Sequence, residues 1–210
     1  MSRATKQRKL NNSIAVIADG QTEKWYLDSV KEHYHPDKLR SIRIEPQLPQ
    51  KKQIRELMAL AKDKVTEGYP QVVLIIDFDE ILSNNEEFTD FKQFHQEFHN
   101  LRHADWMNKL ILIVNNPCLE YWYLLHFNRT SKFYGRYSEM EADLQKCLPH
   151  YNKSEKYYCG TPDIYVRLGG NEGLTKARNN AMPFLPFDIQ TCRERGVSEM
   201  SKLFDYFDTI

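Results

Sequence analysis

Short apolar runs recur along the chain and predict buried strands. The clearest three cover residues 14–18 (IAVIA), 72–76 (VVLII) and 110–114 (LILIV). They are rich in branched aliphatic residues and lack polar alternation, which indicates strands that are buried on both faces. Residues 41–45 (SIRIE) alternate instead and predict a further strand, which two prolines close.

Helical periodicity separates these runs. Apolar side chains recur every three or four residues at 25–33, 51–67 and 88–101, and a polar loop is expected at 83–87. Each of these segments is long enough to cross from one strand to the next. The spacing therefore predicts helices between the strands.

A further helix is predicted directly after the run at 110–114. Asn116 is suited to the N-cap and Pro117 to the first helical position. The chain thus alternates strand and helix four times, and such crossovers join parallel strands. We expect an α/β fold, with a mainly parallel sheet and helices on both faces.

Beyond about residue 130 the pattern is weaker. Residues 138–147, 174–181 and 198–207 have helical spacing, whereas 151–166 show no regular period. We therefore expect three parts, which are a basic N-terminal arm (1–12), an α/β core (13–130) and a C-terminal helical lobe packed on the core (131–210).

The charge balance narrows the possible functions. The 210 residues include 29 Lys and Arg and 29 Asp and Glu, so the formal net charge is zero. The chain lacks the overall positive charge that strong, non-specific nucleic-acid binders use. A local basic surface is still compatible with this balance.

The spacing of the cysteines and the N-terminal residues indicate the cellular compartment of the protein. The four cysteines are scattered without a C-x-x-C pair, which argues against a zinc knuckle or a disulfide framework and is typical of a reducing cytosol. No stretch approaches the roughly 18 apolar residues of a membrane helix, and the first residues do not resemble a secretory leader. We expect a cytoplasmic protein with no membrane contact.

Acidic residues follow the predicted strands. Asp19 follows the first strand, Asp77, Asp79 and Glu80 follow the run at 72–76, and Glu120 comes soon after the run at 110–114. Ligands in open parallel sheets bind at the carboxyl ends of the strands. We therefore expect these carboxylates to gather at one edge of the sheet.

Their spacing is suited to a hard divalent cation. Asp77 and Asp79 are two residues apart at a strand end, so we expect their side chains to leave on the same side, roughly 6–7 Å apart. Mg²⁺ typically takes one or two protein carboxylates and keeps waters for substrate phosphates. With Asp19 as a further ligand or proton carrier, such a site is suited to phosphodiester cleavage. A D-x-D pair alone is also compatible with ordinary loop or N-cap residues.

Four segments together resemble the RloB-like family, which is grouped with toprim nucleases. They are IAVIADGQTEKWYL (14–27), VVLIIDFDE (72–80), NNPCLEYWYLLHF (115–127) and GVSEMSKLFDYF (196–207). The third is the most specific, and the basic arm also fits. The resemblance spans nearly the whole chain and implies a toprim-like, Rossmannoid fold in a bacterial protein encoded beside restriction or phage-defence genes.

The resemblance also implies roles for single residues. Asp19 takes the position of the toprim glutamate proposed as general acid/base, and Asp77 and Asp79 take the metal-ligand positions. Glu120 matches the acidic residue that is specific to the family, and His126 matches its histidine.

Position 19 departs from the family, which usually has glutamate there. Aspartate is one methylene shorter, so its carboxylate falls about 1–1.5 Å short, and small misplacements can cost about a hundredfold in rate. Three explanations stay open: the backbone compensates, Glu23 takes the role one helical turn later, or activity is reduced.

Two residues of the 115–127 segment also have structural interpretations. Glu120 lies in the first turn of a predicted helix, where the dipole favours a carboxylate in any case. His126 lies among apolar residues and is compatible with packing as well as with catalysis. The aromatic residues around Trp122 are expected to pack rather than to stack on bases.

Four basic residues are candidates for nucleic-acid binding. Lys153 and Lys156 are interleaved with Tyr151, Tyr157 and Tyr158, which suggests either a nucleic-acid contact or a solvated loop. Lys176 and Arg178 are candidates to line a phosphate path. The preceding GGNEGLTK segment lacks the ending of a phosphate-binding loop.

Two hypotheses of function follow. The first is a nuclease that requires Mg²⁺ or Mn²⁺ and acts on DNA or RNA, with tRNA as one candidate substrate, in anti-phage defence, controlled by a partner ATPase. In it, Asp77 and Asp79, with Glu80 as a further candidate, would hold the metal. The second is a non-catalytic toprim-like module that binds an ATPase, which the neutral charge and Asp19 favour.

Overall fold

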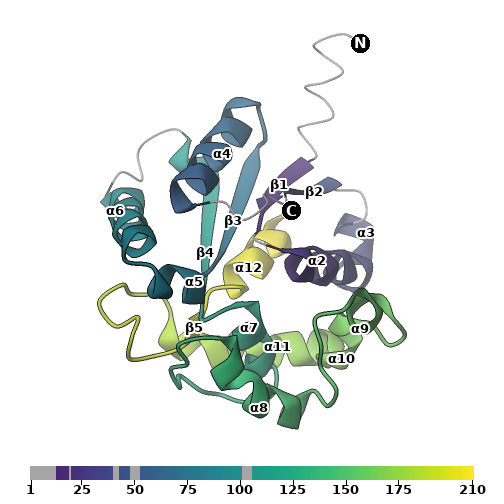
Figure 1. Cartoon of the computed structure of the whole chain (residues 1–210). Coiled ribbons are helices and arrows are strands. Elements are labelled where there is room, and N and C mark those ends of the chain that lie inside the picture. Colours follow the sequence, from purple (N-terminus) through teal and green to yellow (C-terminus); the bar gives the residue numbers. More distant parts are fainter. Residues whose placement is uncertain (1–12, 19, 40–42, 48–52, 101–105) are drawn as a thin grey trace.

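A computed structural model describes residues 13–18, 20–39, 43–47, 53–100 and 106–210, and for 43–47 it describes the backbone alone. The basic arm at 1–12 lies outside the described residues. A five-stranded sheet runs through the middle of the molecule (Figure 1). Its strands are, in spatial order, β2 (Arg43–Gln47), β1 (Ser13–Ile17), β3 (Gln71–Asp77), β4 (Leu110–Asn116) and β5 (Val197–Ser198).

The sheet is mainly parallel, as predicted. The pairs β1–β2, β1–β3 and β3–β4 are parallel, and only the short β5 runs antiparallel to β4. The register aligns Asp77 with Asn115, and Asn115 with Ser198. Three polar residues therefore lie side by side where β3 and β4 end.

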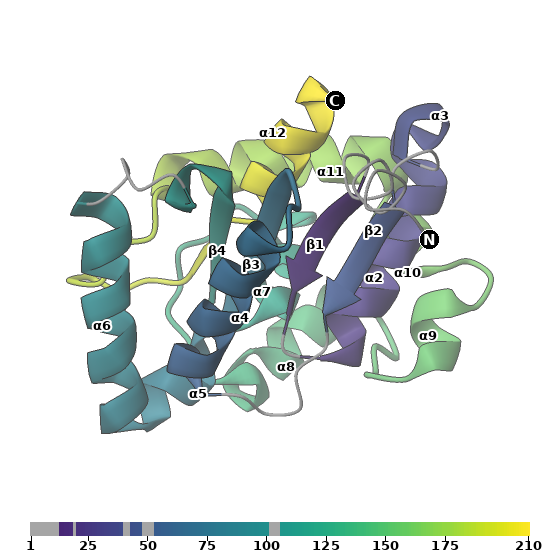
Figure 2. The same cartoon turned by 90° about the horizontal axis from the view of Figure 1, so that it is seen from above.

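Helices cover both faces of the sheet, which explains the continuous apolar runs. On one face, Ile17, Leu74 and Ile76 share a core with α4 (Ile54–Thr66), α5 (Phe78–Ser83) and α6 (Asn85–Asn100). On the other face, Val16 and Ile75 share a core with α2 (Gln21–His33), α7 (Leu119–Leu125) and α12 (Ser201–Thr209). Figure 2 shows the two layers on opposite sides of the sheet. The fold is a Rossmannoid α/β fold.

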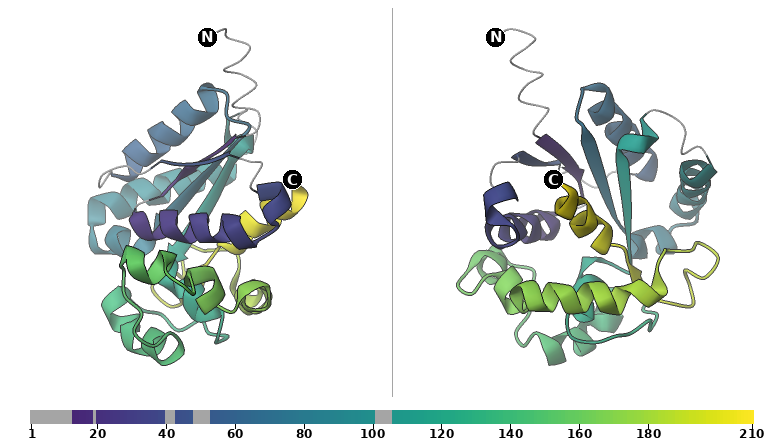
Figure 3. Two further views of the ribbon diagram at one scale, coloured as in Figure 1. Left: turned by 90° about the vertical axis from the view of Figure 1, so that its right-hand side faces the viewer. Right: turned by 180° about the vertical axis from the view of Figure 1, so that it is seen from behind.

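The C-terminal part is mostly helical and packs on α2 and α7. Figures 1 and 3 show these helices beyond the end of the sheet at which β3 and β4 finish. They are α8 (Tyr137–Cys147), α9 (Glu155–Cys159), α10 (Ile164–Arg167), α11 (Gly170–Ala181) and the short 3₁₀ helix η2 (Met182–Phe184). The chain also forms α3 (Pro36–Leu39) and a 3₁₀ helix η1 (Met107–Lys109). The predicted boundary of a separate lobe stays a prediction.

A buried contact joins these parts. The Trp122 side chain of α7 is fully buried, and its Nε1 donates to the Tyr26 hydroxyl of α2 at 2.8 Å. The Trp122 ring also stacks on Phe204 of α12, with ring centroids 5.9 Å apart. The expectation that the aromatic residues of this segment pack in the core is confirmed.

Several predicted boundaries are wrong, each for a local reason. Asn116 is not an N-cap, because it still pairs with Val197 and its amide donates to the Cys192 and Arg195 carbonyls at 2.8 and 3.0 Å. Helix α7 begins only at Leu119, after Cys118 as N-cap.

Other differences concern short segments. Pro46 lies inside β2 rather than after it, which an edge strand tolerates. The loop that was expected at 83–87 is very short, because α5 ends at Ser83 and α6 begins at Asn85. Asn84 Oδ1 accepts from the Glu86 N–H at 2.9 Å, which favours this early helix start. The segment at 151–166, expected to be irregular, includes α9 and all of α10 except its last residue. Among the described helices, none is long and apolar enough to cross a membrane.

Candidate active site

A cavity of about 180 Å³ lies at the carboxyl end of β3. Its walls come from the start of α2, the start of α5, the N-cap of α7 and the segment before α9. The lining residues are Gly20, Thr22, Glu23, Asp77, Asp79, Glu80, Cys118 and Lys153. Three of the predicted metal-site residues and Glu23 thus meet in one place.

Asp77 and Asp79 reach this cavity by a route that the sequence pattern did not predict. The strand ends at Asp77, and Asp79 already belongs to the first turn of α5. The chain turns here because the N–H groups of Phe78 and Asp79 both donate to the Pro117 carbonyl, at 2.7 and 3.0 Å. The expectation that both carboxylates leave on the same side of one strand is therefore wrong, although both line the cavity.

Asn115 on β4 helps to position Asp77. The Ser198 hydroxyl donates to Asn115 Oδ1 at 2.6 Å, which turns the amide nitrogen of Asn115 toward Asp77. That nitrogen lies 3.5 Å from Asp77 Oδ1, a long hydrogen bond. Both Asn115 and Ser198 are buried, and they support Asp77 from behind without lining the cavity themselves.

Glu120 lies behind the lining residues and is almost fully buried, with 1% of its surface exposed. Its Oε1 accepts from Lys153 Nζ at 2.8 Å and from the Tyr151 hydroxyl at 2.7 Å. Its Oε2 is buried and has no hydrogen-bond partner in the described part of the chain. An unpaired buried carboxylate oxygen is costly, so this atom can accept a hydrogen bond from a water or bind a cation.

Negative charge exceeds positive charge around the cavity. Burial raises the pKa of Asp77 well above its usual value, and the nearby carboxylates of Glu23 and Glu120 raise it further. Burial likewise raises the pKa of Glu23, with Glu120 adding to the effect, and burial raises the pKa of Asp79. Each carboxylate thus opposes the ionisation of its neighbours.

Lys153 supplies one positive charge to this group. Burial by itself lowers the pKa of Lys153, but the adjacent Glu120 carboxylate outweighs burial and raises the pKa, so the ammonium stays charged. The Nζ atom also lies 4.5 Å from the centre of the Tyr137 ring. One ammonium cannot balance Glu23, Asp77, Asp79 and Glu120 together.

The remaining predicted acidic residues are placed differently. Asp19 lies outside the described residues. Glu80 is exposed and lines the rim of the cavity, where its N–H donates to Asp79 Oδ1 at 2.9 Å. Glu23 is 3% exposed and accepts from the Thr22 hydroxyl at 3.1 Å.

His126 does not line this cavity. It is buried, its Nδ1 lies 2.9 Å from the Trp122 carbonyl, and its ring lies edge-on to Trp122. On its other side, it lies close to Gly173 of α11. Burial lowers the pKa of His126 to about 4, so the ring is neutral at pH 7. These contacts are those of a packing residue.

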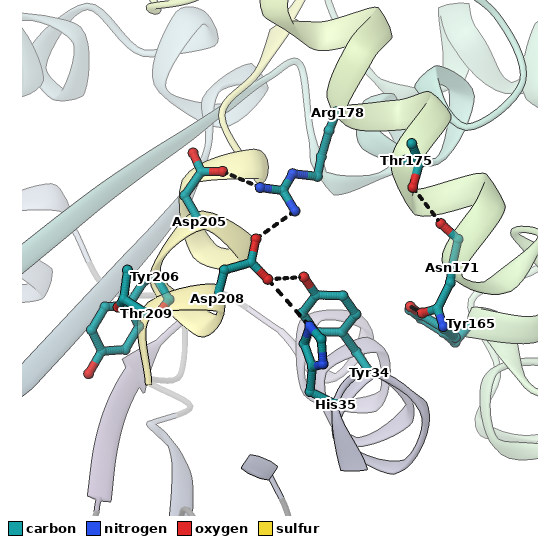
Figure 4. Close-up of polar contacts among 10 residues, drawn as sticks. All are labelled: Tyr34, His35, Tyr165, Asn171, Thr175, Arg178, Asp205, Tyr206, Asp208 and Thr209. Carbon is teal, nitrogen blue, oxygen red and sulfur yellow. Dashed lines mark hydrogen bonds and ion pairs between the residues drawn. The ribbon is translucent and has the colours of Figure 1, made fainter. Parts of the chain in front are cut away.

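Of the four predicted nucleic-acid-binding residues, the structure brings only Lys153 into the cavity. Lys156 on α9 and Lys176 on α11 are exposed. Arg178 is engaged in two ion pairs, with Asp205 at 2.6 Å and Asp208 at 2.9 Å (Figure 4).

The tyrosines near Lys153 are not a surface for base stacking. Tyr151, Tyr157 and Tyr158 are all buried, and the hydroxyls of Tyr151 and Tyr158 lie 2.5 Å apart. Tyr151 instead orients Glu120, a role that sequence reasoning missed because 31 residues separate the two. Cys118 was missed as well, since only the fold places the N-cap of α7 against the carboxylates.

A family model described as RloB-like protein matches residues 14–205. The chain belongs to the RloB-like family. The match covers most of the chain and includes every residue of the cavity. No curated protein and no solved structure matches the chain.

The donor set of this RloB-like protein suits a hard cation. Among the described residues, no three His, Cys, Asp or Glu side chains are placed to hold a metal ion by themselves. Mg²⁺ needs fewer, because it commonly binds through one or two carboxylates, waters and substrate phosphates. Asp77 and Asp79 provide such a pair of oxygen donors.

A second, larger cavity adjoins the first in this RloB-like protein. It measures about 380 Å³, lies between α4 and α5, and shares Asp77 and Glu80 with the carboxylate cavity. Leu57 and Ile81 form part of its apolar wall, and Ser83 lies among its polar residues. Mixed cavities of this size commonly hold small organic groups.

Proposed function

We propose that this RloB-like protein is a toprim-type nuclease that hydrolyses phosphodiester bonds of DNA or RNA with a divalent cation. The observation that carries the proposal is the excess of carboxylates at one cavity, with Glu120 Oε2 left unpaired. These carboxylates are buried at Glu23 and Glu120 and half-buried at Asp77 and Asp79. Such a cluster is costly as it stands, and a cation removes that cost. The family resemblance supports phosphodiester chemistry over other uses of such a site.

The residues around the cavity would have different catalytic roles, according to where they lie. Asp77 and Asp79 would hold Mg²⁺ or Mn²⁺, with Glu80 at the rim. The bound metal would act as Lewis acid and lower the pKa of a coordinated water. Glu23, whose pKa is raised by burial, would take up or release the proton, alone or with Asp19.

Lys153 and Tyr151 would position the site. Their hydrogen bonds to Glu120 Oε1 fix this carboxylate and direct Oε2 elsewhere. The ammonium, which lines the cavity, would also attract a substrate phosphate. The adjoining 380 Å³ cavity would take the nucleoside next to the scissile phosphate.

The family resemblance supports two further parts of the proposal, a role in bacterial anti-phage defence and control by a partner ATPase. Zero net charge fits control by a partner, because the protein would not bind nucleic acid tightly by itself.

A non-catalytic module is the second candidate. The absence of a three-residue metal group among the described residues favours it, as does the Lys153–Glu120 pair, which neutralises part of the charge without a metal. In that case the cavity would carry out no reaction, and the surface that binds an ATPase would be the functional part of the protein.

A cleavage assay distinguishes the nuclease from the non-catalytic module. Purified protein is incubated with Mg²⁺ or Mn²⁺ and single-stranded DNA, duplex DNA, RNA or tRNA, with and without any ATPase that a neighbouring gene encodes. The nuclease proposal expects cleavage that falls at least about a hundredfold in Asp77→Asn/Asp79→Asn, a typical loss for an essential polar group. Asp63→Asn, an exposed change on α4, is the matched control. Cleavage that survives in the double variant would point to a contaminant, and none under any condition would favour the module.

A further inference from the structure

Two histidines on α6 face each other away from the carboxylate cavity. His95 and His99 are four residues apart, so they lie one above the other on the same side of the helix. Their Nε2 atoms are 3.1 Å apart, and the ring centroids are 4.4 Å apart. Each ring therefore presents its Nε2 atom to the other.

The surrounding side chains hold the first ring in place. His95 is partly buried, and its ring packs against Phe91 and edge-on against Phe187, each with centroids 5.6 Å apart. Phe187 belongs to the segment that precedes β5, and its N–H donates to the buried carboxylate of Glu199 at 3.0 Å. The ring of His95 is thus fixed by two parts of the fold.

The distance between the two nitrogens is that of two ligands on one metal ion. Imidazole nitrogens bind Zn²⁺ at about 2.0–2.1 Å, so two of them on a tetrahedral ion lie about 3.3 Å apart, and on an octahedral ion about 2.9 Å apart. The separation of 3.1 Å falls between these values. No movement of the helix is needed to bring both nitrogens to an ion.

We propose that His95 and His99 form a binding site for a transition-metal ion of the Zn²⁺, Ni²⁺ and Cu²⁺ class. In the metal-free pair one Nε2 carries the proton of the shared hydrogen bond. When metal binds, that ring takes the tautomer with its proton on Nδ1, and both Nε2 lone pairs point at the ion. Mg²⁺ is not expected here, because imidazole nitrogen suits the softer metals.

The surroundings leave room for the other ligands. A cavity of about 220 Å³ is lined by both histidines together with Asn100 and Gln190, and it can hold the waters that complete the coordination. The carboxylates of Asp188 and Glu199 act on His95 as neighbouring negative charges, which favours a cation, while Lys202 opposes it. Among the described residues no third His, Cys, Asp or Glu completes the site, so we expect modest affinity.

Titration of the full-length protein, free of any histidine tag, tests the site. Ni²⁺ and Cu²⁺ are titrated by calorimetry, and the Cu²⁺ complex is examined by electron paramagnetic resonance. In the Asp77→Asn/Asp79→Asn background, where the carboxylate cavity no longer competes for metal, we expect one ion per chain, tighter binding of Cu²⁺ than of Ni²⁺, and hyperfine coupling to two imidazole nitrogens. His99→Ala should weaken binding at least tenfold. His99 is exposed, so this variant is expected to fold.

Two further variants make the result unambiguous. Gln96→Ala changes an exposed neighbour on the same helix and should bind as the wild type does. Asp77→Asn/Asp79→Asn should also bind Ni²⁺ normally, because this site does not depend on the carboxylate cavity. Unchanged affinity and an unchanged resonance spectrum in His99→Ala would overturn the proposal.

Discussion

Two clusters of this protein each combine one basic side chain with several carboxylates but differ in burial and charge balance. The carboxylate cavity gathers Glu23, Asp77 and Asp79 around one lysine, whereas the α11–α12 cluster pairs Arg178 with Asp205 and Asp208 (Figure 4). The first is largely buried and has excess negative charge. The second is largely exposed, and its arginine is matched by carboxylates.

The pKa values of the two clusters shift in opposite directions. Burial and neighbouring carboxylates raise the pKa of Asp77 well above normal. For Asp208, burial acts in the same upward direction, but hydrogen bonds from Tyr34 and Arg178 outweigh it and lower the pKa. Charged groups that stabilise one another are typical of a structural cluster, and charged groups that destabilise one another indicate a place for a ligand. Charge imbalance combined with burial therefore distinguishes the candidate site.

Removing the positive charge from each cluster should give the largest difference in stability. Lys153→Met leaves Glu120, which is 1% exposed, without its cation, and we expect a loss of about 2 kcal/mol, less than for a fully buried pair because Lys153 is 44% exposed. Arg178→Met should cost at most about 1 kcal/mol, as for exposed ion pairs. Urea denaturation of both variants measures the loss in the free energy of unfolding. Equal losses would mean that the two clusters do not differ in the way described.

The pH dependence of stability should differ in sign between the clusters. Because the pKa of Asp77 is raised in the folded state, its contribution is present below its unfolded pKa and is lost as the pH rises through the folded pKa. Asp77→Asn should therefore raise the melting temperature of the metal-free protein at neutral pH and change little at low pH.

Asp208 should behave in the opposite way. Its pKa is lowered, so its contribution is present above the unfolded pKa and is lost as the pH falls through the folded pKa. Asp208→Asn should lower the melting temperature slightly at neutral pH. Thermal melts between pH 3 and pH 8 compare the two variants, and a stabilising Asp208→Asn or a destabilising Asp77→Asn would contradict the comparison.

A smaller effect is expected from filling the cavity beside the carboxylates. Ser83 is exposed and lines the 380 Å³ cavity, so Ser83→Trp should hinder the nucleoside without disturbing the core. We expect KM to rise about tenfold, since contacts to one base are worth roughly 1–3 kcal/mol. Thr89→Trp, an exposed change on α6 outside this cavity, is the matched control. If both variants keep the wild-type KM, the nucleoside lies elsewhere.

The sheet and its helices could be predicted because their signals are local. The runs at 72–76 and 110–114 are apolar on both faces, and the structure buries them on both faces. Boundaries were less predictable where tertiary contacts decide them. Asn116 has the local chemistry of an N-cap, yet its pairing with Val197, distant in sequence, keeps it in the sheet.

The candidate site was predictable in part for the same reason. Asp77 and Asp79 follow a strong strand signal, and Glu23 lies one turn into a helix that a strand precedes. Lys153 and Tyr151 carry no such signal, because only the packing of the C-terminal helices brings them to Glu120. The sequence suggested Lys153 as a nucleic-acid contact but could not show that it lies among carboxylates.

The central claim is that the unbalanced carboxylate cavity binds a divalent cation, and calorimetric titration with Mn²⁺ tests it most directly. The protein is titrated as wild type, as Asp77→Asn/Asp79→Asn, and as Asp205→Asn, which alters the balanced cluster. We expect binding at this cavity in the wild type and in Asp205→Asn, and its loss in the double variant. Binding of equal affinity in all three proteins, or in none of them, would contradict the account.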